Sequence, residues 1–127
     1  MTKVFIIAGA GAAGAVCRYG LATVSQRLAD TTFPVGTLTV NLMGCFLIGF
    51  LGWIFAGPVL VREEYRFALL IGFLGAFTTF SSYGLETFSL LNDGQKGAAL
   101  ANILLSNAAG LALVWVGYRL AEHWYGG

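Results

Sequence analysis

Charged residues divide the chain into four long apolar stretches. Residues 31–61, 67–85 and 97–118 carry no charge, and residues 4–24 are interrupted only by Arg18. A helix needs roughly 20 apolar residues to cross the hydrocarbon core of a bilayer, so each stretch is long enough to span it. The pattern predicts four transmembrane helices, near residues 3–27, 34–58, 66–91 and 97–121.

The connections between these helices are short and contain the turn residues. They fall at residues 30–34, 57–66 and 92–94, where Asp, Pro, Gly and Asn gather. Such connections leave no room for a second folded unit. We therefore expect an all-α integral membrane protein in which residues 1–127 form a single membrane domain.

Composition supports a membrane protein and argues against other classes. Hydrophobic residues make up 57% of the chain and charged residues 10%, whereas about 25% is usual in a soluble domain. The net charge of +1 offers no basic patch for a nucleic acid. Cys17, Cys45 and His123 lack the spacing of a metal site or a disulfide framework. No nucleophile and base are paired, so we do not expect an enzyme.

Glycine is abundant, with 18 residues, and recurs at short spacing. Gly11 and Gly14 form one such pair, and Gly72 and Gly75 form another. Small residues let helix backbones approach closely in a membrane, where apolar bulk gives helices little reason to associate. We expect packing faces at these glycines, and some of them to mark a break in a helix.

The basic residues give only a weak orientation signal. With four spans both termini face one side, which carries four basic residues against two on the other, or three if Arg18 reaches an interface. The positive-inside rule orients a protein by this difference, which is small here. Four short helices also enclose little volume. Our hypothesis is an antiparallel, dual-topology homodimer. The basic residues on the side of the termini are Lys3, Arg62, Arg66 and Arg119, and those on the other side are Arg27 and Lys96.

Three of the predicted helices carry polar side chains at helical spacing. One carboxylate, Glu86, lies within the third span, where ionisable residues are costly and usually functional. Interhelical hydrogen bonding would account for any one stripe. Three stripes and a carboxyl group together favour a hydrated or ligand-binding path. The stripes are Thr37, Asn41 and Gly44; Thr79, Ser82, Tyr83 and Glu86; and Asn102, Ser106 and Gly110, with Asn107 beside them.

The residue types along this path favour an anion over a cation. Arg18 is the one cation within the predicted spans, and Phe80 and Tyr83 lie three residues apart in the polar stretch. An aromatic ring is positive at its edge, so rings presented edge-on stabilise an anion without carrying charge. A cation path more often shows several carboxylates or a carbonyl filter.

Three motifs resemble those of a known family. The first helix contains GAAGAVCRY at residues 11–19, the second GTLTVNLMGCF at 36–46, and the third GFLGAFTTFSSYGLE at 72–86. They are similar to the family patterns G-x-x-G-A-x-x-R-Y, G-T-L-x-x-N-x-x-G and G-F-x-G-x-x-T-T-F-S-T-F-x-x-E. Over essentially its full length the chain resembles the small bacterial fluoride channels, the Fluc/CrcB family.

This resemblance implies a passive fluoride-selective channel that exports fluoride from the cytoplasm and protects against its toxicity. It implies a multi-pass protein of the bacterial inner (plasma) membrane and a dual-topology homodimer with two antiparallel pores. Its expected partners are fluoride, the bilayer and a second copy, with no other protein and no nucleic acid. It further implies a broken third helix, whose backbone carbonyls at Gly75 and Thr78 hold a structural Na⁺ at the dimer centre.

The resemblance also assigns roles to individual residues. Phe80 and Tyr83 would form an edge-on aromatic box, Asn41 would cap the pore from the second helix, and Arg18 would lie in an anion-gathering vestibule. The chain departs from the family where Ser82 replaces the usual Thr and Tyr83 the usual Phe, and the added hydroxyl needs a partner. A polar track would contain Glu86, Thr37 and Ser106, and Thr79, Ser82 and Asn102 complete the expected pore residues.

Two other functions are compatible with four short helices. A small proton-coupled multidrug transporter is one, but it needs a carboxylate in the first helix, where this chain has Arg18. A membrane assembly subunit that transports nothing is the other, but it would not require Glu86 or the polar third helix.

Overall fold

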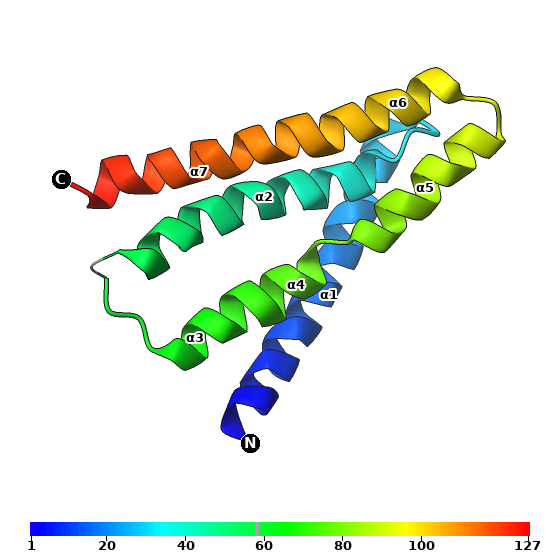
Figure 1. Ribbon diagram of the computed structural model, residues 1–127. Helices are drawn as coiled ribbons and strands as arrows, with labels where there is room; N and C mark the ends of the chain where they lie inside the picture. The colour runs from blue at the N-terminus through cyan, green and yellow to red at the C-terminus, as the bar shows by residue number, and fades with distance from the viewer. Residues whose placement is uncertain (58) are drawn as a thin grey trace.

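The computed structural model describes residues 1–57 and 59–127 and contains four membrane-length helical runs (Figure 1). The first two are single helices, and the other two are built from several segments. In the third, the chain leaves helical geometry after Phe77 and resumes it at Phe80. The elements are α1 (Thr2–Ala29), α2 (Val35–Ala56), α3 (Glu63–Phe67), the π-helical η1 (Ala68–Leu74), α4 (Gly75–Phe77), α5 (Phe80–Asn92), α6 (Lys96–Leu104), the π-helical η2 (Leu105–Ala109) and α7 (Gly110–Tyr125).

The four runs confirm the predicted spans, with small differences at their ends. They contain 28, 22, 30 and 30 residues and are long and apolar enough to cross a membrane. The third run begins at Glu63 and not at 66, because Glu63 and Glu64 occupy its first turn, where acidic side chains favour a helix. The fourth run continues past 121 to Tyr125. The second ends at Ala56, and its predicted end at residue 58 lies outside the described residues.

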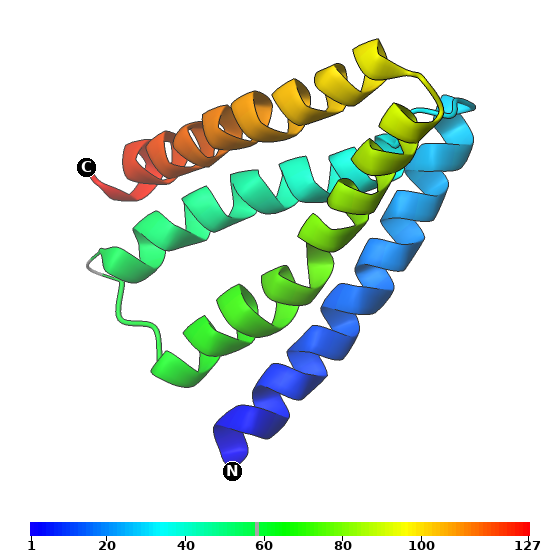
Figure 2. The same ribbon diagram turned by 45° about the vertical axis from the view of Figure 1, so that its right-hand side comes forward.

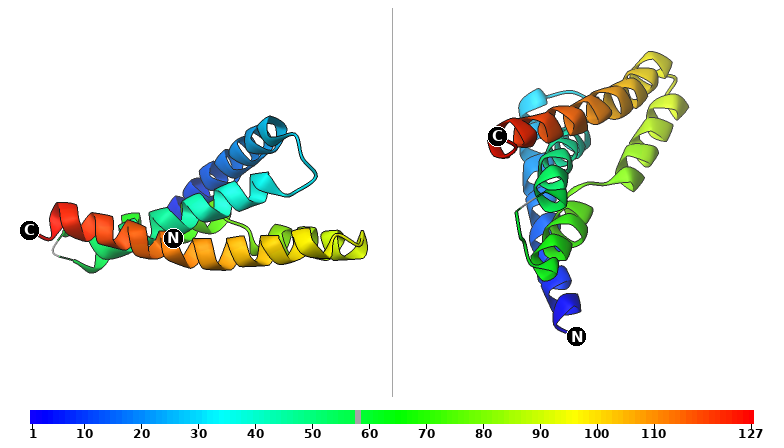
Figure 3. Two further views of the ribbon diagram at one scale, coloured as in Figure 1. Left: turned by 90° about the horizontal axis from the view of Figure 1, so that it is seen from above. Right: turned by 60° about the vertical axis from the view of Figure 1, so that its left-hand side comes forward.

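The helices are arranged as two packed pairs joined by a contact between α1 and α2. α7 runs along α2, and η1 and α4 lie on α1 (Figures 1 and 2). After the break α5 turns away from the line of α4 and packs chiefly on α6 (Figure 3, right). The break thus separates the half of the third run that packs on α1 from the half that packs chiefly on α6.

Glycines allow the closest approaches between these helices. A Cβ atom at Gly49 of α2 would lie 2.0 Å from the Val114 carbonyl oxygen of α7, and one at Gly14 of α1 would lie 2.3 Å from the Phe73 carbonyl oxygen of η1. A Cβ atom at Gly72 of η1 would lie 2.8 Å from the Ile7 carbonyl oxygen of α1. The prediction of packing faces at Gly14 and Gly72 is confirmed.

We predict that Gly49→Ala destabilises the protein, because α2 and α7 must separate to admit the methyl group. Overpacking of this kind costs about 1–3 kcal/mol. The matched control is Gly52→Ala on the same helix, where a Cβ atom would have no neighbour within 4 Å. Unfolding by denaturing detergent measures both variants. Equal stability of the two would contradict the close approach.

Candidate functional site

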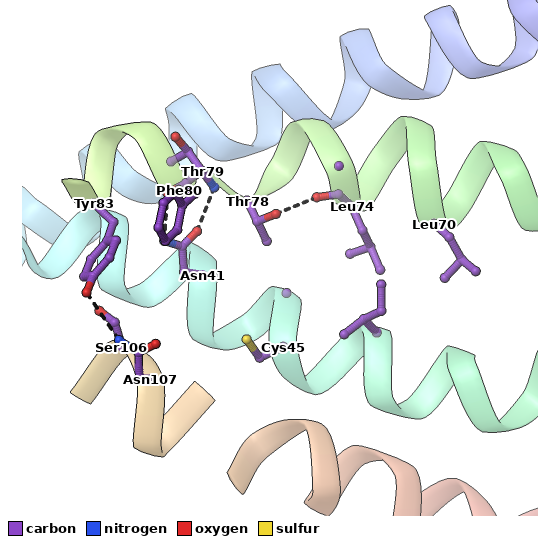
Figure 4. Close-up of a pocket in the computed structure, with 13 residues that line it drawn as sticks. Asn41, Cys45, Leu70, Leu74, Thr78, Thr79, Phe80, Tyr83, Ser106 and Asn107 are labelled. Carbon is purple, nitrogen blue, oxygen red and sulfur yellow. Dashed lines mark hydrogen bonds between the residues drawn. The ribbon is translucent and has the colours of Figure 1, made fainter. Parts of the chain in front are cut away.

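The break in the third run is held open by one side chain of α2. Thr78 and Thr79 have extended backbones, with φ −96° and ψ 158° at Thr78 and φ −149° and ψ 111° at Thr79. The Asn41 amide pairs with both polar groups of the Thr79 backbone: its Nδ2 donates to the carbonyl at 3.0 Å, and its Oδ1 accepts from the N–H at 2.8 Å (Figure 4). Unpaired backbone groups cost several kcal/mol within a membrane. The hydrogen bonds from Asn41 therefore lower the free-energy cost of the break.

Two amides that would continue the helix are diverted to side chains. The Thr79 N–H, which in a regular helix would bond to the Gly75 carbonyl, donates to Asn41. The Ser82 N–H, which would bond to the Thr78 carbonyl, donates to the Thr79 hydroxyl at 3.2 Å and caps α5. The carbonyls of Gly75 and Thr78 thereby lose their helical partners.

These two carbonyls fit the chemistry of a small hard cation. Carbonyl oxygens are ligands for Ca²⁺, Mg²⁺ and K⁺ in proteins, as hard cations prefer oxygen. Within residues 1–57 and 59–127 no group of three or more His, Cys, Asp and Glu side chains could hold a metal ion. The freed backbone oxygens are therefore the better candidates for the predicted cation site.

A groove of about 330 Å³ lies on one side of the break (Figure 4). Phe80 and Tyr83 of α5 line it, with their ring centroids 5.4 Å apart and their planes at 49°. Phe80 is 82% exposed in the single chain. The remaining lining mixes polar and apolar residues: Asn41, Gly44, Cys45, Ile48, Leu70, Leu74, Gly75, Thr78, Thr79, Ser106 and Asn107.

A second cavity, of about 270 Å³, shares Thr79 with the groove. Arg18 of α1, Thr37 of α2 and Ser82 of α5 line it, so the cation of the first helix faces hydroxyl groups from two others. Thr79 is buried between the two cavities. The groove and the second cavity therefore meet at the break.

The third-helix carboxylate is tied to the second cavity through Thr37. The Thr37 hydroxyl donates to Glu86 Oε1 at 2.7 Å. Glu86 Oε2 is buried and has no hydrogen-bond partner among the described residues. Buried polar atoms are normally paired with protein or water, so this oxygen has a hydrogen-bonding capacity that the described residues leave unused.

The structure corrects the predicted polar face of the third helix. Thr79 precedes α5 as its cap and does not lie on a helical face. Ser82 and Tyr83 line different cavities, because adjacent residues of an α-helix point about 100° apart. The prediction of one continuous stripe through Thr79, Ser82, Tyr83 and Glu86 is wrong.

The fourth-helix residues Ser106 and Asn102 are hydrogen-bonded to each other at 3.5 Å but differ in what they line. Ser106 lines the groove, whereas Asn102 lines neither cavity and is 2% exposed. Asn102 donates to the Thr87 hydroxyl at 2.9 Å, and that hydroxyl donates to the Tyr83 carbonyl at 2.7 Å. Asn102 therefore joins α6 to α5 in this chain.

Two residues of this region were not among the predicted site residues. Asn107 lines the groove and donates to the Tyr83 hydroxyl at 3.2 Å, and its place next to Ser106 was the available signal. Gln26 ties down the connection between α1 and α2: it donates to the carbonyls of Thr31 and Phe33 and accepts from the Gly36 N–H. Nothing in the sequence marks Gln26 for this contact.

The fold and the site together define a multi-pass membrane protein with two cavities that meet at a broken helix. A family model described as CrcB-like protein, Camphor Resistance (CrcB) matches residues 5–118. The chain belongs to this family, which confirms the resemblance seen in its motifs.

Curated relatives of the chain carry a functional name. A protein of Salinibacter ruber is 46% identical over 127 residues, which cover 100% of this chain and 95% of the relative. One of Geobacter sulfurreducens is 46% identical, covering 96% and 98%, and one of Citrifermentans bemidjiense is 43% identical, covering 96% and 98%. Each is named a fluoride-specific ion channel. The relatives are channels and not enzymes.

We predict that Asn41→Leu destabilises the break, because it leaves the Thr79 N–H without its partner and leaves the Thr79 carbonyl with only the bond that an N-cap carbonyl accepts within its helix. Each orphaned group costs about 1–3 kcal/mol. The control is Thr39→Val on the same helix, whose hydroxyl donates within α2, to the Val35 carbonyl at 2.8 Å. Hydrogen exchange at the Thr79 amide and the free energy of unfolding measure the effect. Unchanged protection of this amide in Asn41→Leu would contradict the role of Asn41.

Proposed function

We propose that this chain forms a passive, fluoride-selective channel that lets fluoride leave the cytoplasm and so protects the cell from it. The observation that carries the proposal is the break clamped by Asn41, where the groove and the second cavity meet within a membrane-length helical run. The names of the relatives support the choice of ion. The family match favours neither a multidrug transporter nor a non-transporting subunit.

The proposed path replaces the water around the anion in steps. Arg18 draws anions toward the second cavity, which Ser82 and Thr37 also line, with the proton of the Thr37 hydroxyl directed to Glu86. Thr79 connects this cavity to the groove, where Phe80 and Tyr83 lie close together. Fixed donors and ring edges can substitute for hydration without binding the ion too tightly to leave. Asn41, Glu86 and Ser106 complete the polar lining that we propose, with Asn102 supporting α5 from α6.

A second, inverted copy completes the channel in this proposal. One chain leaves Phe80 82% exposed and leaves polar groups such as Asn107 uncovered within a membrane-length helix. Lipid tails do not satisfy polar groups, so another protein surface or water must cover them. The near balance of basic residues on the two sides favours an antiparallel, dual-topology homodimer in the plasma membrane, with residues 1–127 of each copy acting as one membrane domain.

The Gly75 and Thr78 carbonyls would hold Na⁺ at the centre of such a dimer. Both have lost their helical partners to Asn41 and Thr79, and a bound cation would satisfy them. Na⁺ would supply fixed positive charge beside the break. The carbonyls of one chain offer half of a set that the inverted copy would complete.

The membrane potential supplies the driving force for export. Each elementary charge gains about 2.3 kcal/mol per 100 mV, which corresponds to a concentration ratio of roughly fifty-fold. A cell that is negative inside therefore expels fluoride through a passive path. Hydrofluoric acid enters as a neutral molecule and ionises in the cytoplasm, so the cell needs such an exit.

We predict that Phe80→Ile abolishes fluoride efflux from liposomes, followed with a fluoride electrode, while the protein stays folded. Isoleucine fills similar space but has no polarised ring edge. The matched control is Phe88→Ile, because Phe88 is an exposed aromatic residue of the same helix that lines neither cavity. Normal efflux from Phe80→Ile would remove the aromatic pair from the mechanism, and no efflux from the unmodified protein would refute the proposed function.

Dual topology makes a separate prediction. In sealed vesicles, about half of the molecules should expose an N-terminal epitope tag to an external protease, since the weak charge bias permits both insertions. A chain with added lysines near Lys3 serves as the control, because it should shift to one orientation. If all molecules of the unmodified chain share one orientation, the antiparallel dimer is refuted.

A further inference from the structure

The hydroxyl of Tyr83 makes one contact that a phenylalanine could not make. Tyr83 lies on α5 and Asn107 lies on η2, and both line the groove (Figure 4). Asn107 Nδ2 donates to the Tyr83 hydroxyl oxygen at 3.2 Å and to the Ile103 carbonyl at 2.8 Å. The π-helical turn of η2 presents the adjacent residues Ser106 and Asn107 to the same groove, as π-turns often do at functional sites.

The direction of the hydrogen bond to Tyr83 follows from counting protons. A carbonyl oxygen can only accept, so the atom of Asn107 that faces Ile103 must be its nitrogen. That nitrogen has two protons, and its two contacts use both of them. The Tyr83 oxygen must therefore accept from Asn107, and its own proton points elsewhere.

The remaining proton of Tyr83 is available to a ligand in the groove. Across residues 1–57 and 59–127, the only hydrogen bond of the Tyr83 hydroxyl is the one that it accepts from Asn107. A hydroxyl that accepts one hydrogen bond becomes a stronger donor for the next. A hydrogen bond from such a donor to an anion is charge-assisted and about twice as strong as a neutral one.

We propose that Tyr83 donates its hydroxyl proton to the anion in the groove, and that Asn107 is the positioning residue that frees and directs this proton. The proposal rests on the proposed function, since it assumes that fluoride occupies the groove. It gives Tyr83 a role that a ring edge alone does not have. The competing account is that the Tyr83–Asn107 bond only fastens α5 to the fourth run.

A double-mutant cycle separates the two accounts. Tyr83→Phe removes the proton, Asn107→Leu removes its positioning partner, and the two are measured singly and together. The readout is the fluoride concentration that gives half-maximal current through the reconstituted protein. Leu104→Ala is the matched control, because Leu104 is an exposed residue of the same run that lines neither cavity.

We expect Tyr83→Phe to raise the half-maximal fluoride concentration about tenfold or more, the usual effect of one hydrogen bond to a charged group. Asn107→Leu should raise the half-maximal fluoride concentration when Tyr83 is present. It should have no further effect when it is combined with Tyr83→Phe. Leu104→Ala should leave it unchanged.

Three results would overturn the inference. An unchanged half-maximal concentration in Tyr83→Phe removes the hydroxyl from the path. If Asn107→Leu changes the half-maximal concentration equally in the unmodified protein and in Tyr83→Phe, Asn107 acts only as a packing contact. No fluoride current in the unmodified protein refutes the proposed function as well, whereas a current that Tyr83→Phe does not alter refutes this inference alone.

Discussion

The rest of the structure depends on how a broken helix satisfies its backbone where lipid offers no hydrogen bonds. Polar backbone groups within the hydrocarbon core must find partners in the protein or in enclosed water. At Thr79 the N–H gives up its helical partner, and the Asn41 amide replaces it while also donating to the Thr79 carbonyl. One side chain of α2 thereby permits extended backbone at membrane depth and fixes where it occurs.

The features of the candidate site follow from that exchange of partners. The amides diverted to Asn41 and Thr79 release the carbonyls of Gly75 and Thr78. The change of direction after Phe77 swings α5 away from α1, so that Thr79 is left between the groove and the second cavity. Glycines allow close packing in the supporting helices, because α1 meets η1, and α2 meets α7, through direct backbone contact. The polar site is thus carried on a closely packed support.

The sequence alone predicted the four membrane-spanning helices, because charge and the length of apolar stretches follow directly from residue type. It also located packing at Gly14 and Gly72. The break itself came from the family resemblance, since residue spacing cannot reveal that Asn41 will pair with the Thr79 backbone. The same limit explains why the sequence did not separate Ser82 from Tyr83, which line different cavities because of where α5 starts. It also explains why the sequence did not show that Asn102 bonds to Thr87, which lies on another helix. Contacts between helices are properties of the fold and are not encoded in local periodicity.

The central claim is that this site selects a small dehydrated anion by means of hydroxyls, an amide and ring edges. Selectivity tests that claim more directly than flux does. The measurement is the reversal potential of the reconstituted protein with fluoride on one side of the bilayer and chloride on the other. The account predicts a large potential whose sign shows that fluoride carries the current. A potential near zero, which equal permeability to the two anions would give, would contradict it.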